Sequence, residues 1–579
     1  MDFALLTQVF ERIEATRKRL EYTDELAKLF AQAKPGEVKR LAYLCNGILV
    51  PQHQGIELGV GDKLAEQAVS VVSGKSVAEV EKVFRRTGDL GSAAQEILSK
   101  KTQLTLSAQA LSLDKVYDNF MRIATASGAG SQDTKVKTLA ELLSNASPNE
   151  AKVIVRLVQG NLRMGVGEST ILDALSVMKQ GDKSLRPELE RAFNLTSDIG
   201  LVAEMFGRKG IEGVREVKPV PFSPIRPALA ERLLNAEAIF EKLGECAVEG
   251  KYDGLRLAVH KVGDKVEIFS RRQEKMTHMF PDVVEAVRKQ IAAKEAIFEG
   301  EAVAFDDATG VFLPFQETIQ RKRKHGIGAK AKELPLHLFA FELLYCDGRD
   351  LTLLPYKERR AALAKILKGK GVIGLAKTVV VKDASALKKF FDECVSAGLE
   401  GIVAKDLNAP YTAGARKFSW IKLKKSYQTE LADTLDLVIV GYYLGRGKRT
   451  QFGFGGLLAA AYSSRDNVFR TVCKIGTGFS EKQMQEFKQM LSEIEVAKKP
   501  DEVDSVLVPS KWVKPKYVVV VTADEITLSP THTCCRKGGQ GLALRFPRFK
   551  QLRADKAPED ATTEDEILEM FEMQRQKKA

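Results

Sequence analysis

Long apolar runs and paired cysteines are both missing from this sequence of 579 residues. No apolar stretch approaches the roughly 18 residues of a membrane-spanning helix, and the amphipathic N-terminus lacks the apolar core of a secretory signal. The seven cysteines are odd in number and scattered, which argues against a disulfide framework and favours a reducing compartment. Cys534, Cys535 and nearby His532 lack the spacing of a zinc site, so we expect them to be structural. These absences predict an intracellular, cytoplasmic protein without a membrane segment.

The composition is that of an ordinary globular chain with an excess of positive charge. Hydrophobic residues make up 44% and charged residues 28%, and the length suggests about four domains. The formal net charge is +13 and the pI is near 9.1. This charge favours a polyanionic partner, with nucleic acid ahead of a membrane, although a protein that is simply lysine-rich is the alternative.

Periodicity divides the chain into three regions, so we expect a multidomain protein. Residues 1–217 carry apolar positions at helical spacing, beginning with one stretch over residues 4–33 that Pro35-Gly36 ends, and predict an all-α domain. Prolines crowd residues 218–230 and indicate an extended linker. Strand and helix patterns alternate over residues 231–428, which predicts an α+β domain. Short strands with glycine-rich turns over residues 429–579 suit a small β-barrel of the OB-fold type, followed by an exposed strand edge and a polar helix.

Lys251 stands in the string EGKYDGLR at residues 249–256. A tight turn at Asp253-Gly254 would bring backbone close to a phosphate, with the lysine amine and Arg256 beside it. This arrangement suits a lysine that attacks phosphorus and forms a covalent intermediate. A surface hairpin with Asp253-Gly254 as its turn is the alternative that the octapeptide alone leaves open.

Further motifs follow Lys251 in order: FSRR (269–272), FEGEAVAFD (298–306), LFAFELLYCDG (338–348), LEGIVAKDL (399–407), WIKLKK (420–425) and ALRFPRFK (543–550). Together they resemble the covalent nucleotidyltransferases and, within these, the ATP-dependent DNA ligases, most closely the archaeal type related to the eukaryotic replicative ligase. The resemblance covers nearly the whole chain, from the segment QGNLRMGVGE at residues 159–168 to the segment PEDATTEDE at residues 558–566. It implies a helical DNA-binding domain, an adenylylation domain and an OB-fold domain.

The resemblance implies that nicks in duplex DNA are sealed in replication, repair and recombination. ATP would adenylylate Lys251, the AMP would pass to the 5′ phosphate of the nick, and the 3′ hydroxyl would then attack. A free lysine has a pKa near 10.4, so neighbouring cations and a metal ion are needed to favour its neutral form. Lys422 and Lys424, alternate residues of an expected strand, can supply such charges and by resemblance contact the α-phosphate. A solvated lysine strand is the alternative.

Glu301 and Glu400 are the expected ligands of a divalent ion, which would be Mg²⁺ with Mn²⁺ as an alternative. Such hard ions take few protein carboxylates and keep several waters. Each glutamate is bordered by apolar strand residues, where a plain sheet would avoid a charge. Glu299 would share the strand face of Glu301, and we rank it below Glu301.

The remaining nucleotide contacts are implied by the resemblance. The expected nucleotide-binding residues are Glu249, Lys251, Arg256, Arg271, Glu301, Phe341, Arg416, Lys422, Lys424, Arg545 and Arg548. Phe341 would stack on adenine, with a core role as the alternative, and Glu342 stands where the family has aspartate. Glu249 would hold the adenine amino group. Arg545 and Arg548 would orient the pyrophosphate, which requires the last domain to move over the active site about a hinge at residues 424–433.

Contacts with nicked double-stranded DNA are expected at four residues of one glycine-rich segment. Gly160, Arg163, Gly165 and Gly167 could present backbone amides and a charge to phosphates, and helix-end glycines without a ligand are the alternative. The basic run at residues 321–332 is expected to be either a solvated loop or a DNA backbone contact.

A sliding clamp is the weakest of the expected partners. Gln103 and Leu106 match part of a clamp-binding peptide, but Ser107 and Ala108 stand where aromatic anchors are needed. Without such anchors the contact loses roughly 2 kcal/mol or more, so we expect weak or absent binding. The chain is expected to act as a monomer.

Three other classes of protein were weighed against the ligase interpretation. RNA-capping guanylyltransferases and RNA ligases share the chemistry but lack a helical region like residues 1–217. NAD-dependent ligases carry a four-cysteine zinc module that is missing here. A catalytically silent DNA-binding scaffold would have lost Lys251, Glu400 or Lys424, and all three are present. The sequence leaves the preference among ATP, ADP and GTP open.

Overall fold

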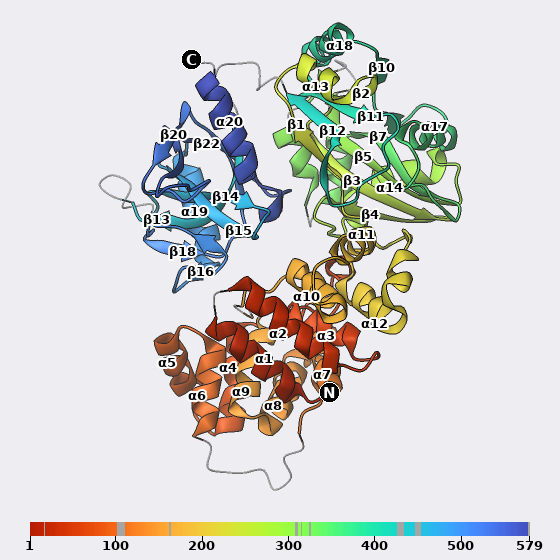
Figure 1. The fold of residues 1–579 in the computed structure, drawn as a ribbon. Coiled ribbons are helices and arrows are strands. Elements are labelled where there is room, and N and C mark those ends of the chain that lie inside the picture. The colour runs from red at the N-terminus through yellow and green to blue at the C-terminus, as the bar shows by residue number, and fades with distance from the viewer. Residues whose placement is uncertain are drawn as a thin grey trace. The chain divides into compact units, whose positions relative to one another are not determined.

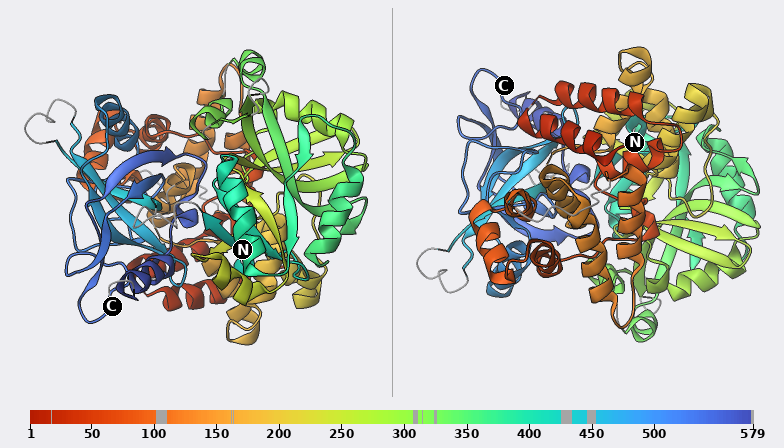
Figure 2. Two further views of the ribbon diagram at one scale, coloured as in Figure 1. Left: turned by 90° about the horizontal axis from the view of Figure 1, so that it is seen from above. Right: turned by 90° about the horizontal axis from the view of Figure 1, so that it is seen from below.

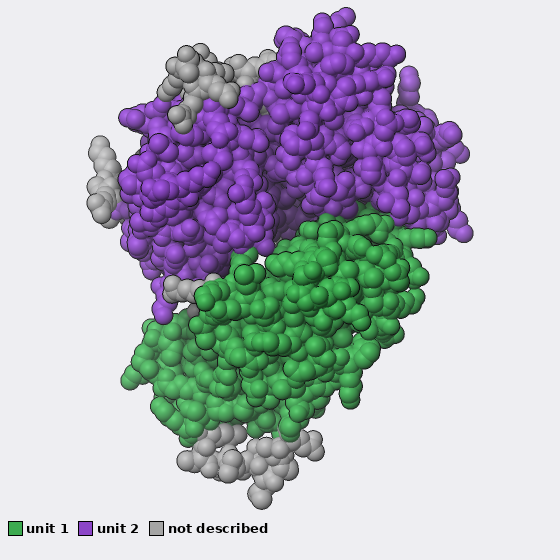
Figure 3. Space-filling view, in the orientation of Figure 1, with its two compact units in different colours: residues 1–226 green, residues 227–579 purple. Residues whose placement is uncertain are grey.

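The computed structural model describes residues 1–16, 18–100, 110–160, 162, 164–306, 311–313, 315–323, 326–424, 434–445 and 453–576. It forms two compact units, residues 1–226 and 227–579 (Figure 3). The candidate clamp peptide, Arg163 and hinge residues 425–433 lie outside the described residues. Among those that are described, no helix is both long and apolar enough to cross a membrane.

The proline-rich segment at residues 218–230 crosses the division between the two units, which falls after residue 226. Hydrogen bonds hold the segment within each unit. Before the division, Ser197 Oγ donates a hydrogen bond to the Pro224 carbonyl at 2.7 Å, and Ser223 Oγ donates one to the Thr196 carbonyl at 2.6 Å. After the division, strand β1 (Leu229–Arg232) pairs in parallel with β12 (Arg416–Lys424). The segment therefore belongs partly to each unit.

The first unit is built from helices that bury one face each in a shared core (Figure 1). Its helices are α1 (Phe3–Ala15), α2 (Arg19–Gln32), α3 (Val38–Cys45), α4 (Asp62–Ser73), α5 (Val77–Thr87), α6 (Leu90–Ser99), α7 (Leu113–Thr125), α8 (Ser131–Asn145), α9 (Pro148–Val158), α10 (Glu168–Gln180), α11 (Arg186–Thr196) and α12 (Ile199–Arg215). Capping boxes begin α5 at Ser76 and α9 at Ser147. The helical region expected before residue 217 is confirmed.

The single helix expected over residues 4–33 is wrong, because α1 and α2 are separate helices. Thr16 leaves the helical conformation with φ −112° and ψ 161°. Its hydroxyl pairs with Glu21, and its carbonyl accepts a hydrogen bond from Tyr22 Oη at 3.1 Å. These side-chain bonds offer the backbone an alternative to helix, which apolar periodicity alone does not reveal.

Two antiparallel-rich sheets form the first part of the second unit. One has the order β1-β12-β11-β2-β10, and the other runs β4-β3-β5-β7-β8 with β6 and β9 at its margins. Their remaining strands are β2 (Cys246–Lys251), β3 (Leu255–Val262), β4 (Lys265–Ser270), β5 (Glu295–Asp306), β6 (Val311–Phe312), β7 (Leu336–Cys346), β8 (Arg349–Asp350), β9 (Ile373–Leu375), β10 (Thr378–Val381) and β11 (Gly401–Asp406). Each sheet has its own apolar cluster, one around Phe298 and one around Phe391.

Helices cover these sheets, namely α13 (Ala236–Leu243), α14 (Pro281–Gln290), α15 (Phe315–Thr318), α16 (Ile327–Glu333), α17 (Tyr356–Ile366) and α18 (Ala384–Ser396). The basic run at residues 321–332 is neither wholly a loop nor wholly solvated, which corrects the expectation. Arg321 is buried and pairs with Asp282 at 2.6 Å, and it donates a hydrogen bond to the Leu334 carbonyl at 2.8 Å. A local count of charges cannot reveal this pairing, because Asp282 lies 39 residues earlier in the chain.

The last part of the second unit is a β-rich body with its own core (Figure 2). Its sheet has the order β16-β18-β13-β14-β15-β17, with β19 pairing β13 and β22, and β20 pairs β21 separately. The elements are β13 (Thr434–Tyr443), β14 (Gly456–Ser463), β15 (Val468–Ile475), α19 (Glu481–Ser492), β16 (Glu495–Val496), β17 (Val503–Asp504), β18 (Lys511–Val513), β19 (Val518–Thr522), β20 (Glu525–Ser529), β21 (Gly541–Arg545), β22 (Arg548–Arg553) and α20 (Glu564–Gln576).

The polar helix expected at the C-terminus is present as α20, but this end of the chain is not wholly exposed. Ile567 of α20 is fully buried, Asp560 of the 3₁₀ turn at Pro558–Asp560 pairs with Arg271, and Glu566 pairs with Arg416. These contacts escaped the sequence pattern because charged side chains make them.

Candidate active site

A pocket lies where the two sheets of residues 227–424 meet residues 553–566, which are called the C-terminal segment below. Its charged lining consists of Glu249, Lys251, Asp253, Arg256, Arg271, Glu301, Lys322, Glu400, Lys405, Arg416, Lys422, Lys424, Asp436, Arg553, Asp555, Lys556, Asp560 and Glu566. Strands β2, β11 and β12 supply one wall, and β3, β5 and β7 supply another. Of the residues predicted from sequence to bind nucleotide or metal, all line this pocket except Arg545 and Arg548.

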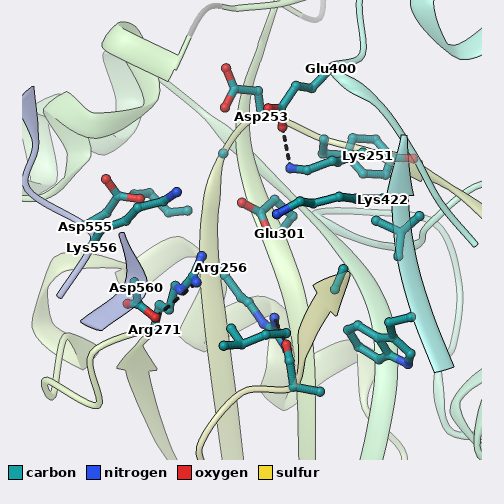
Figure 4. Close-up of a pocket in the computed structure, with 18 of the residues that line it drawn as sticks. Lys251, Asp253, Arg256, Arg271, Glu301, Glu400, Lys422, Asp555, Lys556 and Asp560 are labelled. Atoms are coloured by element: carbon teal, nitrogen blue, oxygen red, sulfur yellow. Dashed lines mark hydrogen bonds and ion pairs between the residues drawn. The ribbon is translucent and has the colours of Figure 1, made fainter. Parts of the chain in front are cut away.

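Lys251 ends β2 and points into the pocket beside Glu400 (Figure 4). Glu400 forms ion pairs with both Lys251 and Lys424, and its backbone N–H donates to the Lys251 carbonyl at 3.0 Å. Burial would raise the pKa of Glu400, but the two ammonium groups hold it well below its ordinary value. Glu400 is therefore a carboxylate that holds the lysine amine in place.

The turn after Lys251 can be this tight only because residue 254 is glycine. A Cβ there would lie 2.3 Å from the Ala302 carbonyl oxygen of β5. The turn therefore packs directly against the strand that carries Glu301. Asp253 lies in this turn, and burial raises the pKa of its carboxyl.

Glu301 faces the pocket from the middle of β5, and burial raises its pKa to about 7. Glu299 differs from it, because its side chain is almost fully buried and paired. It holds Arg256 at 2.9 and 3.0 Å and accepts a hydrogen bond from Tyr411 Oη at 2.8 Å. Glu299 is absent from the pocket lining. The role of Glu301 as a metal ligand stays a prediction.

Phe341 and Trp420 form an aromatic pair at one end of the pocket. Their ring centroids are 6.2 Å apart and the rings are in edge-to-face contact. Glu249 lies there with both carboxylate oxygens engaged. One accepts from Tyr356 Oη and the other pairs with Lys405 Nζ at 2.7 Å. Both oxygens of Glu249 are thus fixed in place by neighbouring side chains.

Lys405 is a pocket residue that sequence reasoning missed. Its ammonium lies 4.1 Å from the Trp420 ring centroid and 5.0 Å from that of Phe341. Burial lowers its pKa. The available signal was a lysine inside the apolar string GIVAK, where a strand between two neighbours has little room for an unpaired charge.

Arg256 and Arg271 reach the pocket but are already paired. Arg256 donates to Glu299 and, at 2.8 Å, to the Ala228 carbonyl. Arg271 pairs with Asp560 at 3.1 Å, which Figure 4 marks with a dashed line. Asp560 comes from the C-terminal segment, so part of the pocket is built from residues more than 300 positions beyond Lys251.

Glu566, in the first turn of α20, pairs with two of the predicted nucleotide contacts. It forms an ion pair with Arg416 and lies 3.5 Å from Lys422 Nζ. Burial lowers the pKa of Lys422 to about 7, and the two cations hold the pKa of Glu566 well below its ordinary value despite its burial. A carboxylate therefore occupies the place at which these cations would meet an anionic ligand.

Arg553 and Lys556 also come from the C-terminal segment and line the pocket, together with Asp436 of β13. Lys556 pairs with Asp436, and Arg553 holds Asp555 at 2.8 Å. Burial lowers the pKa of Lys556 to about 8. None of these residues was predicted, because Arg553, Asp555 and Lys556 follow the last motif and Asp436 lies in none of the motifs.

Arg545 and Arg548 do not line the pocket in this structure. Their side chains are about half exposed and pair with Glu525 at 3.5 Å and with Asp524, respectively. Both partners belong to the same β-rich body. Their contact with pyrophosphate stays a prediction.

The glycine-rich segment of the first unit lies at the start of α10. Gly160 and Gly165 hold left-handed φ angles of 64° and 63°, and Gly167 is the N-cap of α10. A Cβ at any of the three would meet open space. The backbone there is accessible, as a phosphate contact requires, but Glu168 also stands in the first turn of α10.

The pocket holds a lysine at a strand end beside a carboxylate, with further cations, two candidate metal carboxylates and an aromatic pair. This set of residues suits a nucleotidyltransferase. The comparisons specify the enzyme. Three family models match: "DNA ligase N terminus" over residues 2–176, "ATP dependent DNA ligase domain" over 227–424 and "ATP dependent DNA ligase C terminal region" over 450–556. The chain belongs to the ATP-dependent DNA ligases, so the resemblance seen in its motifs is confirmed.

Relatives of full length support this assignment. The chain is 48% identical over 580 residues to "Probable DNA ligase" of Dictyoglomus turgidum, covering 100% of this chain and 99% of the relative. It is 43% identical over 595 residues to the DNA ligase of Staphylothermus marinus, covering 100% of both. A solved structure, mycobacterial DNA ligase D complexed with ATP and MES, is 25% identical with a TM-score of 0.35, covering 58% of this chain and 97% of that one.

Proposed function

We propose that Lys251 is the nucleophile through which this DNA ligase seals nicks. The observation that carries the proposal is the pair of ion contacts that Glu400 makes with Lys251 and Lys424 inside the pocket. They hold a primary amine beside a second cation, where an α-phosphate would be both attacked and neutralised. ATP and DNA are the substrates of the family to which the chain belongs.

In the first step the Lys251 Nζ lone pair forms a bond to the α-phosphorus of ATP, and the bond to the bridging oxygen of the β-phosphate breaks. Pyrophosphate leaves, and the amine loses its proton. The Glu400 carboxylate orients the amine, but its low pKa makes it a poor acceptor for that proton. Lys422 and Lys424 stabilise the negative charge on the phosphate oxygens.

Glu301 and Glu400 are the residues that would hold a divalent ion. Their oxygens, with Asp253 nearby, form the hard donor set that Mg²⁺ prefers, and Mn²⁺ fits the same set. When bound, the ion would supply neutralisation of phosphate charge. Ionisation of Glu301, whose pKa is about 7, favours this role at neutral pH and above.

The adenine base would stack on the Phe341 ring, which lines the pocket. The Glu249 carboxylate would accept a hydrogen bond from the adenine amino group. A guanine would present a carbonyl oxygen at that position, which a carboxylate repels. We therefore infer that ATP is preferred over GTP, and that the Glu249–Lys405 pair maintains this preference.

In the later steps the AMP moves from Lys251 to the 5′ phosphate of the nick, so the N–P bond breaks and a pyrophosphate linkage to DNA forms. The 3′ hydroxyl then attacks the DNA phosphorus, and AMP leaves. Residues 1–217 would hold duplex DNA through its phosphates, with Gly160, Gly165 and Gly167 among the contacts. The β-rich body would act as an OB-fold domain.

The test is transfer of label to the protein. ATP labelled at the α-phosphate should mark the full-length chain, and ATP labelled at the γ-phosphate should not. Lys251→Ala should lose both labelling and sealing. Lys251→Arg should also fail, because the guanidinium group stays protonated.

Lys388→Ala, an exposed lysine on α18, serves as the matched control and should be labelled like the unmodified protein. Labelling that survives in Lys251→Ala would show that another residue is the nucleophile. Labelled GTP in place of ATP tests the base preference in the same assay.

A further inference from the structure

Cys534 and Cys535 of the β20–β21 loop lie against Glu564 at the start of α20. We propose that these three residues form a binding site for one thiophilic divalent ion of the zinc type. The site is separate from the nucleotide pocket, whose lining contains none of the three. Its ligands come from two segments that are 29 residues apart in the chain.

The two sulfur atoms converge although they belong to adjacent residues. Neighbouring side chains normally point apart, but Cys535 holds a left-handed φ of 53°, and the two Sγ atoms are 3.7 Å apart. Two sulfurs that each lie about 2.3 Å from one tetrahedral zinc ion are about 3.8 Å apart. The observed separation therefore suits two thiolates on one ion.

A carboxylate completes a three-ligand set. The two sulfurs and one Glu564 carboxylate oxygen all lie within 4.8 Å of one another. The same carboxylate accepts the Cys535 backbone N–H at 2.5 Å, which fixes it toward the sulfurs. Each carboxylate oxygen has two lone pairs, so this bond leaves capacity for an ion. A fourth position would remain for water or an outside ligand.

Arg470 offsets part of the charge of this set. It pairs with Glu564 at 2.6 Å from β15. Two thiolates and one carboxylate around a divalent ion carry a net charge of −1, and the guanidinium, which also pairs with Asp466 and lies 3.5 Å from Asp504, compensates it in part. A buried ionic group is tolerated when it is compensated in this way.

A disulfide between the same two cysteines is disfavoured by geometry. Adjacent Cα atoms across a trans peptide are about 3.8 Å apart, which is shorter than the usual disulfide range of about 4.4–6.8 Å. Cys534 is fully buried and Cys535 is partly exposed, so an ion can reach the pair from one side. Ion binding fits this placement better than a strained ring.

The consequence for the fold is a bridge between the β20–β21 loop and α20. Glu564 is two residues before Glu566, which pairs with Arg416 and Lys422 in the nucleotide pocket. An ion held by Glu564 would therefore fix the helix start that positions Glu566.

The experiment uses the reduced full-length protein and cobalt(II) as the probe. We expect a thiolate-to-cobalt charge-transfer band that saturates at one equivalent, persists in excess Mg²⁺ and disappears when Zn²⁺ is added. Mg²⁺ should not compete because it is a hard ion that avoids sulfur. The melting temperature should rise with Zn²⁺, since an ion that binds only the folded state stabilises it.

Variants assign the band to the site. Cys535→Ser should abolish it, and Glu564→Gln should keep it while weakening cobalt affinity at least about tenfold, as lost supporting groups at metal sites do. Cys346→Ser, a partly exposed cysteine of β7, is the matched control and should bind like the unmodified protein.

Absence of the band in the unmodified protein would overturn the proposal whether or not any variant folds. A band of equal strength in Cys535→Ser would also overturn it, as would a mass two hydrogens lower that marks a disulfide.

Discussion

Glu342 and Arg359 show how this enzyme compensates charge at the scale of single residues. Glu342 follows Phe341 in β7. The side chains of Glu342 and Arg359 are fully shielded from solvent and are joined by two bonds of 2.8 and 3.1 Å. The buried carboxylate is thus compensated by a buried guanidinium.

Arg359→Met should strongly destabilise the protein, because it removes the guanidinium that pairs with the buried Glu342. Breaking a buried pair in this way costs about 3–5 kcal/mol. Urea unfolding should show a loss of that size, and the double variant with Glu342→Gln should recover most of it. Lys388→Met removes only an exposed partner of Asp392 and should leave the urea midpoint unchanged. Equal midpoints for Arg359→Met and Lys388→Met would contradict this account.

The raised pKa of Glu301 predicts that the stability of the fold depends on pH. Burial raises its folded-state pKa to about 7, above the value of about 4.3 in an unfolded chain. Between these values the unfolded state loses the proton that the folded state keeps, so stability falls as pH rises through this window and the loss is complete above about pH 7. At about 1.4 kcal/mol per unit, the full effect is at most about 4 kcal/mol.

Glu301→Gln removes this titration. Relative to the unmodified protein, the variant should be more stable at pH 8 than at pH 4.5, as measured by melting temperature. Glu285→Gln changes an exposed glutamate of α14 and should not show this trend. If Glu301→Gln and the unmodified protein keep a constant difference over the whole range, the raised pKa is wrong.

At the scale of elements, β12 and α20 are coupled through charge. Strand β12 carries Arg416, Lys422 and Lys424 toward the pocket, and α20 brings Glu566 to two of them. Glu566 also closes a capping box, since it accepts from Thr563 N–H at 2.9 Å while Thr563 Oγ1 accepts from Glu566 N–H at 3.3 Å. One side chain therefore both begins the helix and neutralises the pocket cations.

Glu566→Gln separates these two roles, because glutamine can keep the capping box but carries no charge. The freed Arg416 and Lys422 should bind the triphosphate more tightly. We expect the apparent KM for ATP in self-adenylylation to fall about three- to tenfold, which corresponds to about 0.7–1.4 kcal/mol. Glu572→Gln, at an exposed position of the same helix, should leave KM unchanged. A rise in KM for Glu566→Gln would show that the carboxylate assists nucleotide binding.

At the scale of the whole molecule, the pocket belongs to one of two compact units. Residues 1–226 have their own core, and residues 227–579 contain every residue of the pocket (Figure 3). The net charge of +13 is consistent with a partner that is bound through phosphates.

A chain limited to residues 227–579 should still label itself with ATP but should seal nicks poorly. The full chain should lose DNA affinity steeply as salt rises from about 50 to 200 mM, because phosphate contacts release counterions. Sealing rates and label transfer, measured on both chains over this range, test the separation. Equal sealing by the two chains would mean that residues 1–226 are not the DNA-binding unit.

The sequence by itself determined the family, the order of the regions and the pocket residues that lie within motifs. Lys251, Glu301, Glu400, Lys422 and Lys424 could be identified because each stands in a short string whose chemistry is local. Strand alternation then places Lys422 and Lys424 on one face, so neighbours in sequence become neighbours in the pocket.

Only the tertiary structure decided which charges meet across long stretches of chain. Lys422 and Glu566 are 144 residues apart in the chain, and Arg271 and Asp560 are 289 residues apart. Cys535 and Glu564 are 29 residues apart. Neither spacing nor periodicity encodes such pairs, because each depends on how whole sheets and the C-terminal segment pack. Arg321 and Lys405 were missed for the same reason. A charged residue in a sequence does not show which distant residue will pair with it and so allow its burial.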